Sequence, residues 1–314
     1  MTDQNYYILK IFELYIYNLT ILMGNCCNHF KFIRKHKTKK LVKKNKSAYY
    51  QFNIGDKLGN YCVTHRIYNK IWLLKKGDKK YVGKFIKNNY RGKYELEILK
   101  KNKSQLLPIF QECVECDFYN FTMYQYVSGK DMYDTFVNDI PLNEKKIYPL
   151  FKQMLECINH CHQLGYLHLD IKLENFIATP VIDELTGNTS YHITLIDFGH
   201  SLPKIIDKIL IPDCRGTKGY IAPEILMKFV TAKSDVWSLG CVVYVMLAGK
   251  FPFRKSKVQF LQDIYSVDHH FDLLKSIQHL SHPLRELILK MLKPEHDERI
   301  SIREMMTHRY FNKR

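Results

Sequence analysis

The stretch His168-Leu169-Asp170-Ile171-Lys172-Leu173-Glu174-Asn175, followed by Asp197-Phe198-Gly199, is the most informative part of this sequence. Few reactions need a carboxylate, a lysine two residues later, an amide three further on and a second carboxylate beyond a hairpin. Phosphoryl transfer does. One carboxylate accepts the proton of the attacking hydroxyl, the lysine neutralises phosphoryl charge, and the amide and second carboxylate hold Mg²⁺. We expect these roles for Asp170, Lys172, Asn175 and Asp197, in the same order.

The spacing H-x-D-x-K-x-x-N followed by D-F-G resembles the catalytic loop and adjoining segment of eukaryotic protein kinases. Residues 216–224 match the G-T-x-x-Y-x-A-P-E pattern of the serine/threonine type, and residues 235–240 resemble a motif whose aspartate, here Asp235, holds the catalytic-loop backbone. Thr217 together with Lys172 favours serine/threonine over tyrosine specificity. The resemblance covers about residues 54–312 and implies an α+β fold of two lobes, with ATP, Mg²⁺ and protein substrates.

Two charged residues upstream match the family's phosphate anchor. Lys84 ends a strand pattern in Val82-Gly83-Lys84, where the resemblance implies a lysine that grips the α- and β-phosphates. Its partner would be a glutamate on the next helix. Glu95 occupies that position in an E-x-x-I-L pattern, whereas Glu97, two residues on, points off that face. We therefore assign Lys84 and Glu95 to the catalytic set.

Residues 123–132 resemble the hinge that joins the two lobes. By that resemblance, the backbones of Gln125 and Val127 would hydrogen-bond adenine, and Asp131 would reach the ribose. Tyr124 would limit the depth of the pocket behind adenine.

The expected glycine-rich phosphate loop is missing. If Lys84 is aligned, strands fall at 61–67 and 71–74, and only residues 68–70 remain between them. Gly55 and Gly59 lie too early. Either the loop is short and free of glycine, or the first strand is longer than its pattern indicates. The alternative function is a pseudokinase that acts as a scaffold; the complete charged set favours an active enzyme.

Leu169 stands where regulated kinases carry an arginine that binds a phosphate on the activation loop. That loop, residues 200–221, has hydroxyls only at Ser201, Thr217 and Tyr220, and none in its middle. We therefore expect activity that does not depend on loop phosphorylation. A last pair implied by the resemblance, Glu224 with Arg299, would be a buried structural ion pair.

The hydrophobic pattern agrees with two lobes. Alternating segments at 61–67, 71–74, 80–86, 107–114 and 121–127 predict strands, with one helix at 90–101. After Gly129 the period changes. Apolar residues at helical spacing between Ile147 and Cys161 predict a long helix ending at Gly165, and further helices are expected at about 232–247, 257–265 and 283–293. We divide the chain into a tail at 1–48, a first lobe at 54–127 and a second at 128–312.

The nine cysteines do not indicate a disulfide framework, because a chain of 314 residues can bury a core of its own and the implied chemistry uses cytosolic ATP. Cys113-x-x-Cys116 lacks a second pair, so we do not expect zinc there. Cys157, His160, Cys161 and His162 crowd one helix, and we expect buried side chains there, too, and no metal.

The net charge of +17 is partly a property of the tail, where nine basic residues lie between Lys31 and Lys46 without one acid, and the rest of the chain is moderately basic. Such a run favours an anionic membrane. Nucleic acid is not expected, since the aromatic or glycine residues of an RNA-binding segment are absent. Met23-Gly24-Asn25-Cys26-Cys27 resembles a myristoylation start with two palmitoylation sites, provided that translation begins at Met23.

Two other interpretations of the tail stay open. The apolar stretch 6–23 could be a membrane helix, although Lys10 and Glu13 oppose insertion. The tail could also be a basic segment in solution. We expect a monomeric cytoplasmic enzyme that is peripheral to a membrane.

Overall fold

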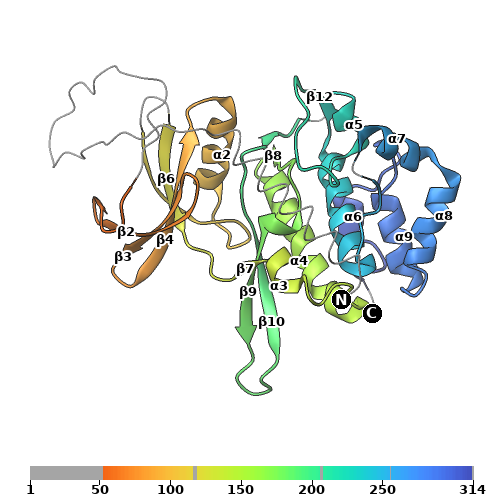
Figure 1. The fold of residues 1–314 in the computed structure, drawn as a ribbon, viewed down its shortest axis with the longest axis horizontal. Helices are drawn as coiled ribbons and strands as arrows, with labels where there is room; N and C mark the ends of the chain where they lie inside the picture. The colour runs from red at the N-terminus through yellow and green to blue at the C-terminus, as the bar shows by residue number, and fades with distance from the viewer. Residues whose placement is uncertain (1–51, 116–118, 206–207, 255, 313–314) are drawn as a thin grey trace.

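The computed structural model describes residues 52–115, 119–205, 208–254 and 256–312. The tail at 1–48, with Gly24, Cys26, Cys27 and the basic run, lies outside this range, and so does Cys116. Figure 1 shows two lobes, a smaller one rich in strands and a larger one built of helices. The predicted α+β fold of two lobes is confirmed.

The first lobe is a six-stranded antiparallel sheet in the order β1-β2-β3-β4-β6-β5, with one helix, α2, beside it (Figure 1). Its elements are β1 (Lys57–Leu58), β2 (Tyr61–Tyr68), β3 (Ile71–Lys76), β4 (Lys79–Lys87), α2 (Tyr90–Lys101), β5 (Phe110–Val114) and β6 (Tyr119–Gln125).

An aromatic cluster fixes one face of this sheet. The rings of Phe85 and Phe121 lie 4.7 Å apart between centroids, and Trp72 packs against both. Gly83 makes room for them, because a Cβ there would come within 2.3 Å of the Phe121 ring. Since side chains alternate along a strand, Val82 and Lys84 lie on the opposite face.

The connection between β2 and β3 settles the question of the phosphate loop. Tyr68 pairs with Ile71, so Asn69 and Lys70 alone form the turn, and Lys70 takes a left-handed conformation with φ of 66°. Gly59 instead belongs to the preceding turn between β1 and β2. The loop is therefore short and free of glycine.

The second lobe surrounds α6 (Ala232–Ala248), which is apolar on nearly every side and almost wholly buried. Its other helices are α3 (Met132–Phe136), α4 (Glu144–Gln163), the 3₁₀ helix η1 (Leu173–Asn175), α5 (Pro223–Leu226), α7 (Lys257–Tyr265), α8 (Val267–Ser276), α9 (His282–Met291) and α10 (Ile302–Met306).

Three small sheets accompany the helices of the second lobe. One sheet has the order β10-β9-β7, and two small pairs are β11 with β8 and β12 with β13. The hairpin of β9 and β10 projects from the body (Figure 1). The strands are β7 (Lys130–Asp131), β8 (Tyr166–Leu167), β9 (Phe176–Ile182), β10 (Thr189–Leu195), β11 (Leu202–Pro203), β12 (Ile209–Leu210) and β13 (Phe229–Val230).

Most predicted elements are present within a few residues of their expected ends, but α8 was not predicted. Its apolar residues Val267, Phe271 and Leu274 fall at helical spacing, but this stripe lies on the surface: Val267 is 82% exposed and Phe271 is 73% exposed. Only Leu273 of this helix is buried. Among the described helices, none has the length and apolar character to cross a membrane.

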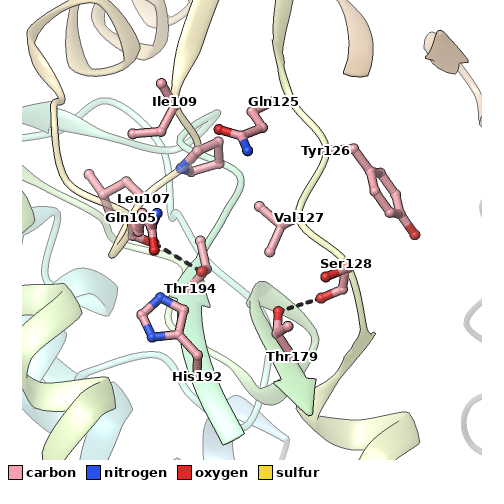
Figure 2. Close-up of a pocket in the computed structure, with 11 residues that line it drawn as sticks. Gln105, Leu107, Ile109, Gln125, Tyr126, Val127, Ser128, Thr179, His192 and Thr194 are labelled. Carbon is pink, nitrogen blue, oxygen red and sulfur yellow. Dashed lines mark hydrogen bonds between the residues drawn. The ribbon is translucent and has the colours of Figure 1, made fainter. Parts of the chain in front are cut away.

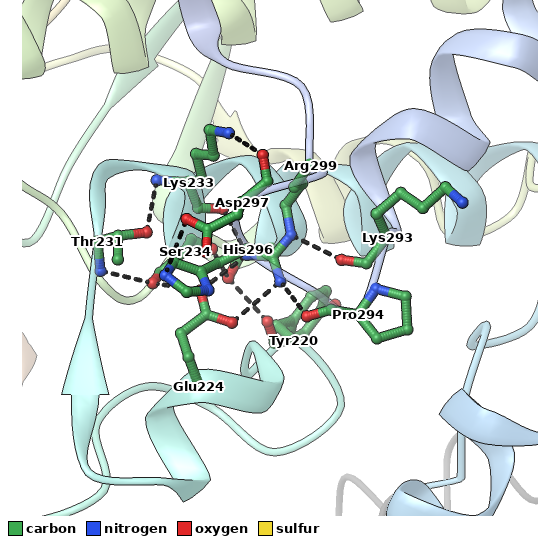
Figure 3. Close-up of polar contacts among 11 residues, drawn as sticks. Tyr220, Glu224, Thr231, Lys233, Ser234, Lys293, Pro294, His296, Asp297 and Arg299 are labelled. Carbon is green, nitrogen blue, oxygen red and sulfur yellow. Dashed lines mark hydrogen bonds and ion pairs between the residues drawn. The ribbon is translucent and has the colours of Figure 1, made fainter. Parts of the chain in front are cut away.

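The predicted pair of Glu224 and Arg299 is confirmed, and Figure 3 shows the contacts around it. Arg299 donates to both carboxylate oxygens, at 2.7 and 3.0 Å, and also to the carbonyls of Lys233, Lys293 and Pro294. Both side chains are almost fully buried, and these bonds satisfy the guanidinium. The pair ties α5 to the loop before α10.

Candidate active site

Lys84 lies between two carboxylates. From β4, its Nζ is 2.7 Å from Oε1 of Glu95 on α2 and 2.7 Å from Oδ1 of Asp197. Burial opposes the charge on Lys84, but Asp197 and Glu95 outweigh it and raise the lysine pKa. In turn, Lys84 holds the pKa of Asp197 well below its ordinary value. Burial raises the pKa of Glu95, and the charge of Lys84 opposes that rise.

A second cluster forms around Asp170. Lys172 Nζ is 3.2 Å from its Oδ2, and the hydroxyl of Thr217 donates to its Oδ1 at 2.7 Å. Lys172 also donates to Thr217 at 3.0 Å. Asn175 completes the group, since its Nδ2 donates to the Asp170 carbonyl at 2.8 Å and to Oδ2 at 3.2 Å.

A buried carboxylate, that of Asp235, binds the backbone of the loop at residues 168–170. Asp235 on α6 accepts the N–H of His168 at 2.9 Å and that of Leu169 at 2.7 Å. The Nε2 of His162 lies 2.8 Å from the same carboxylate. Leu169 has φ of 64°, a conformation that these two bonds stabilise. This placement agrees with the role implied by the Asp235 motif.

The segment after Asp197 turns inward. Phe198 is 1% exposed and packs edge-on against His168, with ring centroids 5.3 Å apart. Asp197 itself has φ of 62° and is 45% exposed at its side chain. The carboxylate is therefore partly open to solvent while the neighbouring ring is buried in the core.

The donor set suits Mg²⁺, which prefers oxygen ligands. Because Nδ2 of Asn175 is used within the loop, its amide oxygen Oδ1 is left for a cation. The partly exposed carboxylate of Asp197 stays ionised, since Lys84 depresses its pKa. These two residues would hold the metal, as the sequence analysis expected.

The hinge places Gln125 at the end of β6 and Val127 just beyond it. In the described part of the chain, no acceptor takes the N–H of Val127, so this donor is available to a ligand. Burial raises the pKa of Tyr124, behind the hinge, although nearby Lys84 opposes that rise. Asp131 uses Oδ1 to accept the N–H of Asp134 and cap α3.

A cavity of about 170 Å³ is lined by side chains of the hinge and of neighbouring segments (Figure 2). Thr194 donates to the carbonyl of Gln105, and Thr179 donates to that of Ser128, so β9 and β10 are tied to the hinge region on this side. None of the charged active-site residues lines this cavity. It lies apart from the catalytic groups.

The structure places the cysteine and histidine residues of α4 in structural roles. Cys157 and Cys161 are fully buried, while His160 contacts Asn102 and His162 contacts Asp235. No group of three potential ligands capable of holding a metal occurs among the described residues.

Sequence reasoning missed four residues that connect α2 to the activation segment: Tyr90, Arg91, Asp213 and Arg215. An arginine in a loop is ordinarily solvated, yet the Arg215 side chain is only 1% exposed. No motif marks these residues, and only their juxtaposition in space reveals the contact.

Comparison with known proteins agrees with this arrangement. A family model described as a protein kinase domain matches residues 57–311. The serine/threonine-protein kinase cds1 of Schizosaccharomyces pombe is 34% identical over 228 residues, which cover 69% of this chain and 47% of that protein. CBL-interacting protein kinase 1 of Oryza sativa subsp. japonica is 33% identical over 62% of this chain and 40% of that protein. The chain thus spans about half the length of these relatives.

The solved structure of the Rad53 kinase domain and SCD2 shares the fold. It aligns with a TM-score of 0.63 at 22% identity, covering 81% of this chain and 90% of the other.

Proposed function

The chain belongs to the protein kinase family, and on that premise we propose that it is an ATP- and Mg²⁺-dependent protein serine/threonine kinase. One observation carries this proposal: two charged clusters, Lys84 with Glu95 and Asp197, and Asp170 with Lys172 and Asn175, are both assembled. A scaffold has no need of either arrangement.

The roles of the residues follow from their geometry. Asp170 would orient a serine or threonine hydroxyl of the substrate and take its proton. Lys172, next to Asp170, would neutralise charge on the transferred group. Lys84 would bind the nucleotide phosphates while Glu95 fixes its position, and backbone groups of the hinge would hold adenine. Asn175 and Asp197 would hold Mg²⁺, which would neutralise charge on the phosphates.

The short turn at Asn69-Lys70 replaces the backbone cradle expected over the phosphates. Lys84 therefore carries a larger share of phosphate binding than in a chain with a glycine-rich loop. This feature supports weaker nucleotide binding, but it removes none of the groups that act on the transferred phosphoryl group.

The test is phosphorylation of generic basic proteins by the full chain with Mg²⁺ and ATP, compared with Asp170→Asn. We expect a loss of about 10²–10⁴-fold in the variant, as for removal of a general base. Glu184→Gln, a change in the exposed β9–β10 turn, is the matched control and should be silent. If the wild type transfers no more phosphate than Asp170→Asn, and ATP with Mg²⁺ does not raise its melting temperature, the pseudokinase alternative is correct.

We also propose a preference for arginine two or three residues before the phosphorylated residue. Glu174 has a buried Oε2 without a hydrogen-bond partner in the described structure, and burial raises its pKa. A guanidinium would satisfy this oxygen and keep the carboxylate charged. A peptide-library screen should show the preference, and Glu174→Gln should reduce it. Selection of acidic or proline residues at those positions would reject it.

The tail supports a further proposal, attachment to the cytoplasmic face of a membrane. A single myristoyl chain binds with an association constant of only about 10⁴ M⁻¹, so a second signal is needed. Cys26 and Cys27 would be the sites of palmitoylation. Each of the nine basic residues would contribute at most about 1 kcal/mol of binding near an anionic leaflet.

Fractionation of cells expressing the chain from Met23 tests this proposal. Gly24→Ala should release the protein to the cytosol, and neutralising the basic residues from Lys35 to Lys46 should weaken attachment in a salt-dependent way. Mass spectrometry of the native N-terminus identifies the mechanism. A peptide from residues 1–22 would exclude myristoylation of that product.

A further inference from the structure

A four-residue cluster joins the start of α2 to the activation segment. We call it the α2 clamp: Tyr90 and Arg91 from α2, and Asp213 and Arg215 from the segment. Arg91 donates to Oδ2 of Asp213. Arg215 donates to the Tyr90 hydroxyl at 3.1 Å and to the carbonyl of His200 at 3.1 Å. His200 directly follows Asp197-Phe198-Gly199. The guanidinium of Arg215 therefore connects the first residue of the activation segment with α2.

The burial of Arg215 makes this contact more than a surface ion pair. Its side chain is 1% exposed, and a buried guanidinium is costly without a carboxylate near it. Asp213 is that carboxylate. Its Oδ1 lies 3.8 Å from Nε of Arg215, and both atoms are buried without a hydrogen-bond partner in the described structure. Asp213 therefore faces Arg91 with one oxygen and Arg215 with the other.

The position of Asp213 also suits the helix that it contacts. The N-terminal end of a helix favours negative charge, yet the first turn of α2 holds no acidic residue of its own. Asp213 provides one from the activation segment. Asn89, the N-cap of α2, accepts the N–H of Gly92, and the Arg91 side chain contacts Asp213 at the same end of the helix.

The clamp lies between the two catalytic clusters. Glu95, which pairs with Lys84, is on the same helix four residues after Arg91. On the other side, Thr217 follows Arg215 by two residues and bonds Asp170. A shift of α2 away from the segment would separate Lys84 from Glu95, because a helix moves as a rigid unit over this distance.

None of the three loop hydroxyls offers a free phosphorylation site. Ser201 is fully buried, Tyr220 is 6% exposed, and Thr217 is engaged by Asp170 and Lys172. The acidic group of the segment that contacts α2 is the carboxylate of Asp213.

We propose that Asp213 and Arg215 are positioning residues that dock the activation segment on α2 and so keep Glu95 paired with Lys84 without a phosphate. This inference rests on the proposed kinase activity for its consequence, although the docking itself does not require catalysis.

The test combines hydrogen exchange with kinetics on the full chain. Asp213→Asn keeps the shape of the side chain and removes its charge. We expect amide exchange in residues 92–99 to become at least about fivefold faster, and kcat/KM for ATP to fall at least about tenfold, with the melting temperature nearly unchanged. Asp213→Glu, which keeps the charge, should leave the exchange rate and kcat/KM close to their wild-type values. Asp139→Asn, which removes one member of the exposed pair with Lys146, is the matched control and should change neither.

Phosphatase treatment provides a separate arm and should leave the wild-type rate within about twofold. The proposal is overturned if Asp213→Asn leaves exchange in α2 at the wild-type rate, or if phosphatase lowers activity more than tenfold by removing a phosphate from Ser201, Thr217 or Tyr220. If the wild type transfers no phosphate but Asp213→Asn still frees α2, the kinase function fails and the docking role stands.

Discussion

The hydroxyl of Thr217 donates a 2.7 Å hydrogen bond to Oδ1 of Asp170, although 47 positions separate them in the chain. The same hydroxyl accepts a bond from Lys172. The activation segment is thus attached directly to the carboxylate proposed to accept the substrate proton. This contact couples the position of the segment to the position of the reacting group.

Replacing Thr217 should separate these groups. Thr217→Ala removes a hydrogen bond to a charged group, which contributes about 1.5–3 kcal/mol, so kcat should fall roughly 10- to 150-fold. Thr217→Ser keeps the hydroxyl and should retain most activity. Steady-state kinetics on both variants measures the two values of kcat. If kcat falls equally in both, the methyl group of Thr217 matters and the hydrogen bond does not.

The metal should depend on Asp197. Asp197→Asn removes the charge that Lys84 stabilises, and kcat should fall by about 10²–10³-fold, as when a charge-stabilising group is lost. The rise in melting temperature that ATP produces should no longer increase with Mg²⁺. Glu184→Gln is again the control. If the variant still responds to Mg²⁺ like the wild type, Asp197 is not a ligand of the metal.

The buried pair of Glu224 and Arg299 should dominate the stability of the second lobe. Arg299→Met leaves Glu224 buried without its partner and should cost about 3–5 kcal/mol. For a domain of this size each kcal/mol lowers the melting temperature by about 2–4 °C. Glu298→Gln, which breaks an exposed pair with Lys293 at 3.8 Å, should change stability by less than about 0.5 kcal/mol. Thermal unfolding of the two variants makes the comparison, and similar losses would contradict the role of burial.

Stability should depend on pH through Asp235. Burial opposes its charge, but the bonds from His162 and the backbone outweigh it, so its pKa lies below 3.8 in the folded state. A depressed pKa contributes stability above the unfolded value, and that stability is lost as pH falls through the folded value. The difference in unfolding free energy between wild type and Asp235→Asn should therefore be constant from pH 7 to about pH 5 and shrink below about pH 3.8. Denaturant titrations at these pH values measure it. A difference that grew on acidification would mean a raised pKa.

The sequence by itself determined the fold family and the charged groups that carry the chemistry. The motifs at 168–175, 197–199, 216–224 and 235–240 are each a short stretch of fixed spacing and can be recognised in the sequence, although Thr217 and Asp235 contact groups far away along the chain. The strands and long helices were also readable, because their apolar faces are buried and leave a periodic pattern. The missing glycine-rich loop was visible as a short interval, and the structure then showed a two-residue turn.

Only the tertiary structure decided how the parts meet. Arg215 contacts Tyr90 across 125 positions of sequence, and Lys84 meets Asp197 across 113. Spacing along the chain cannot encode such contacts, since they depend on how the two lobes pack. The helix α8 was not predicted, and only the structure shows that its apolar stripe lies on the surface. The sequence identified the reacting groups because each lies in a short, recognisable motif. No motif marks the α2 clamp, and only the folded chain shows it, because Arg215 becomes buried between segments that are distant in the sequence.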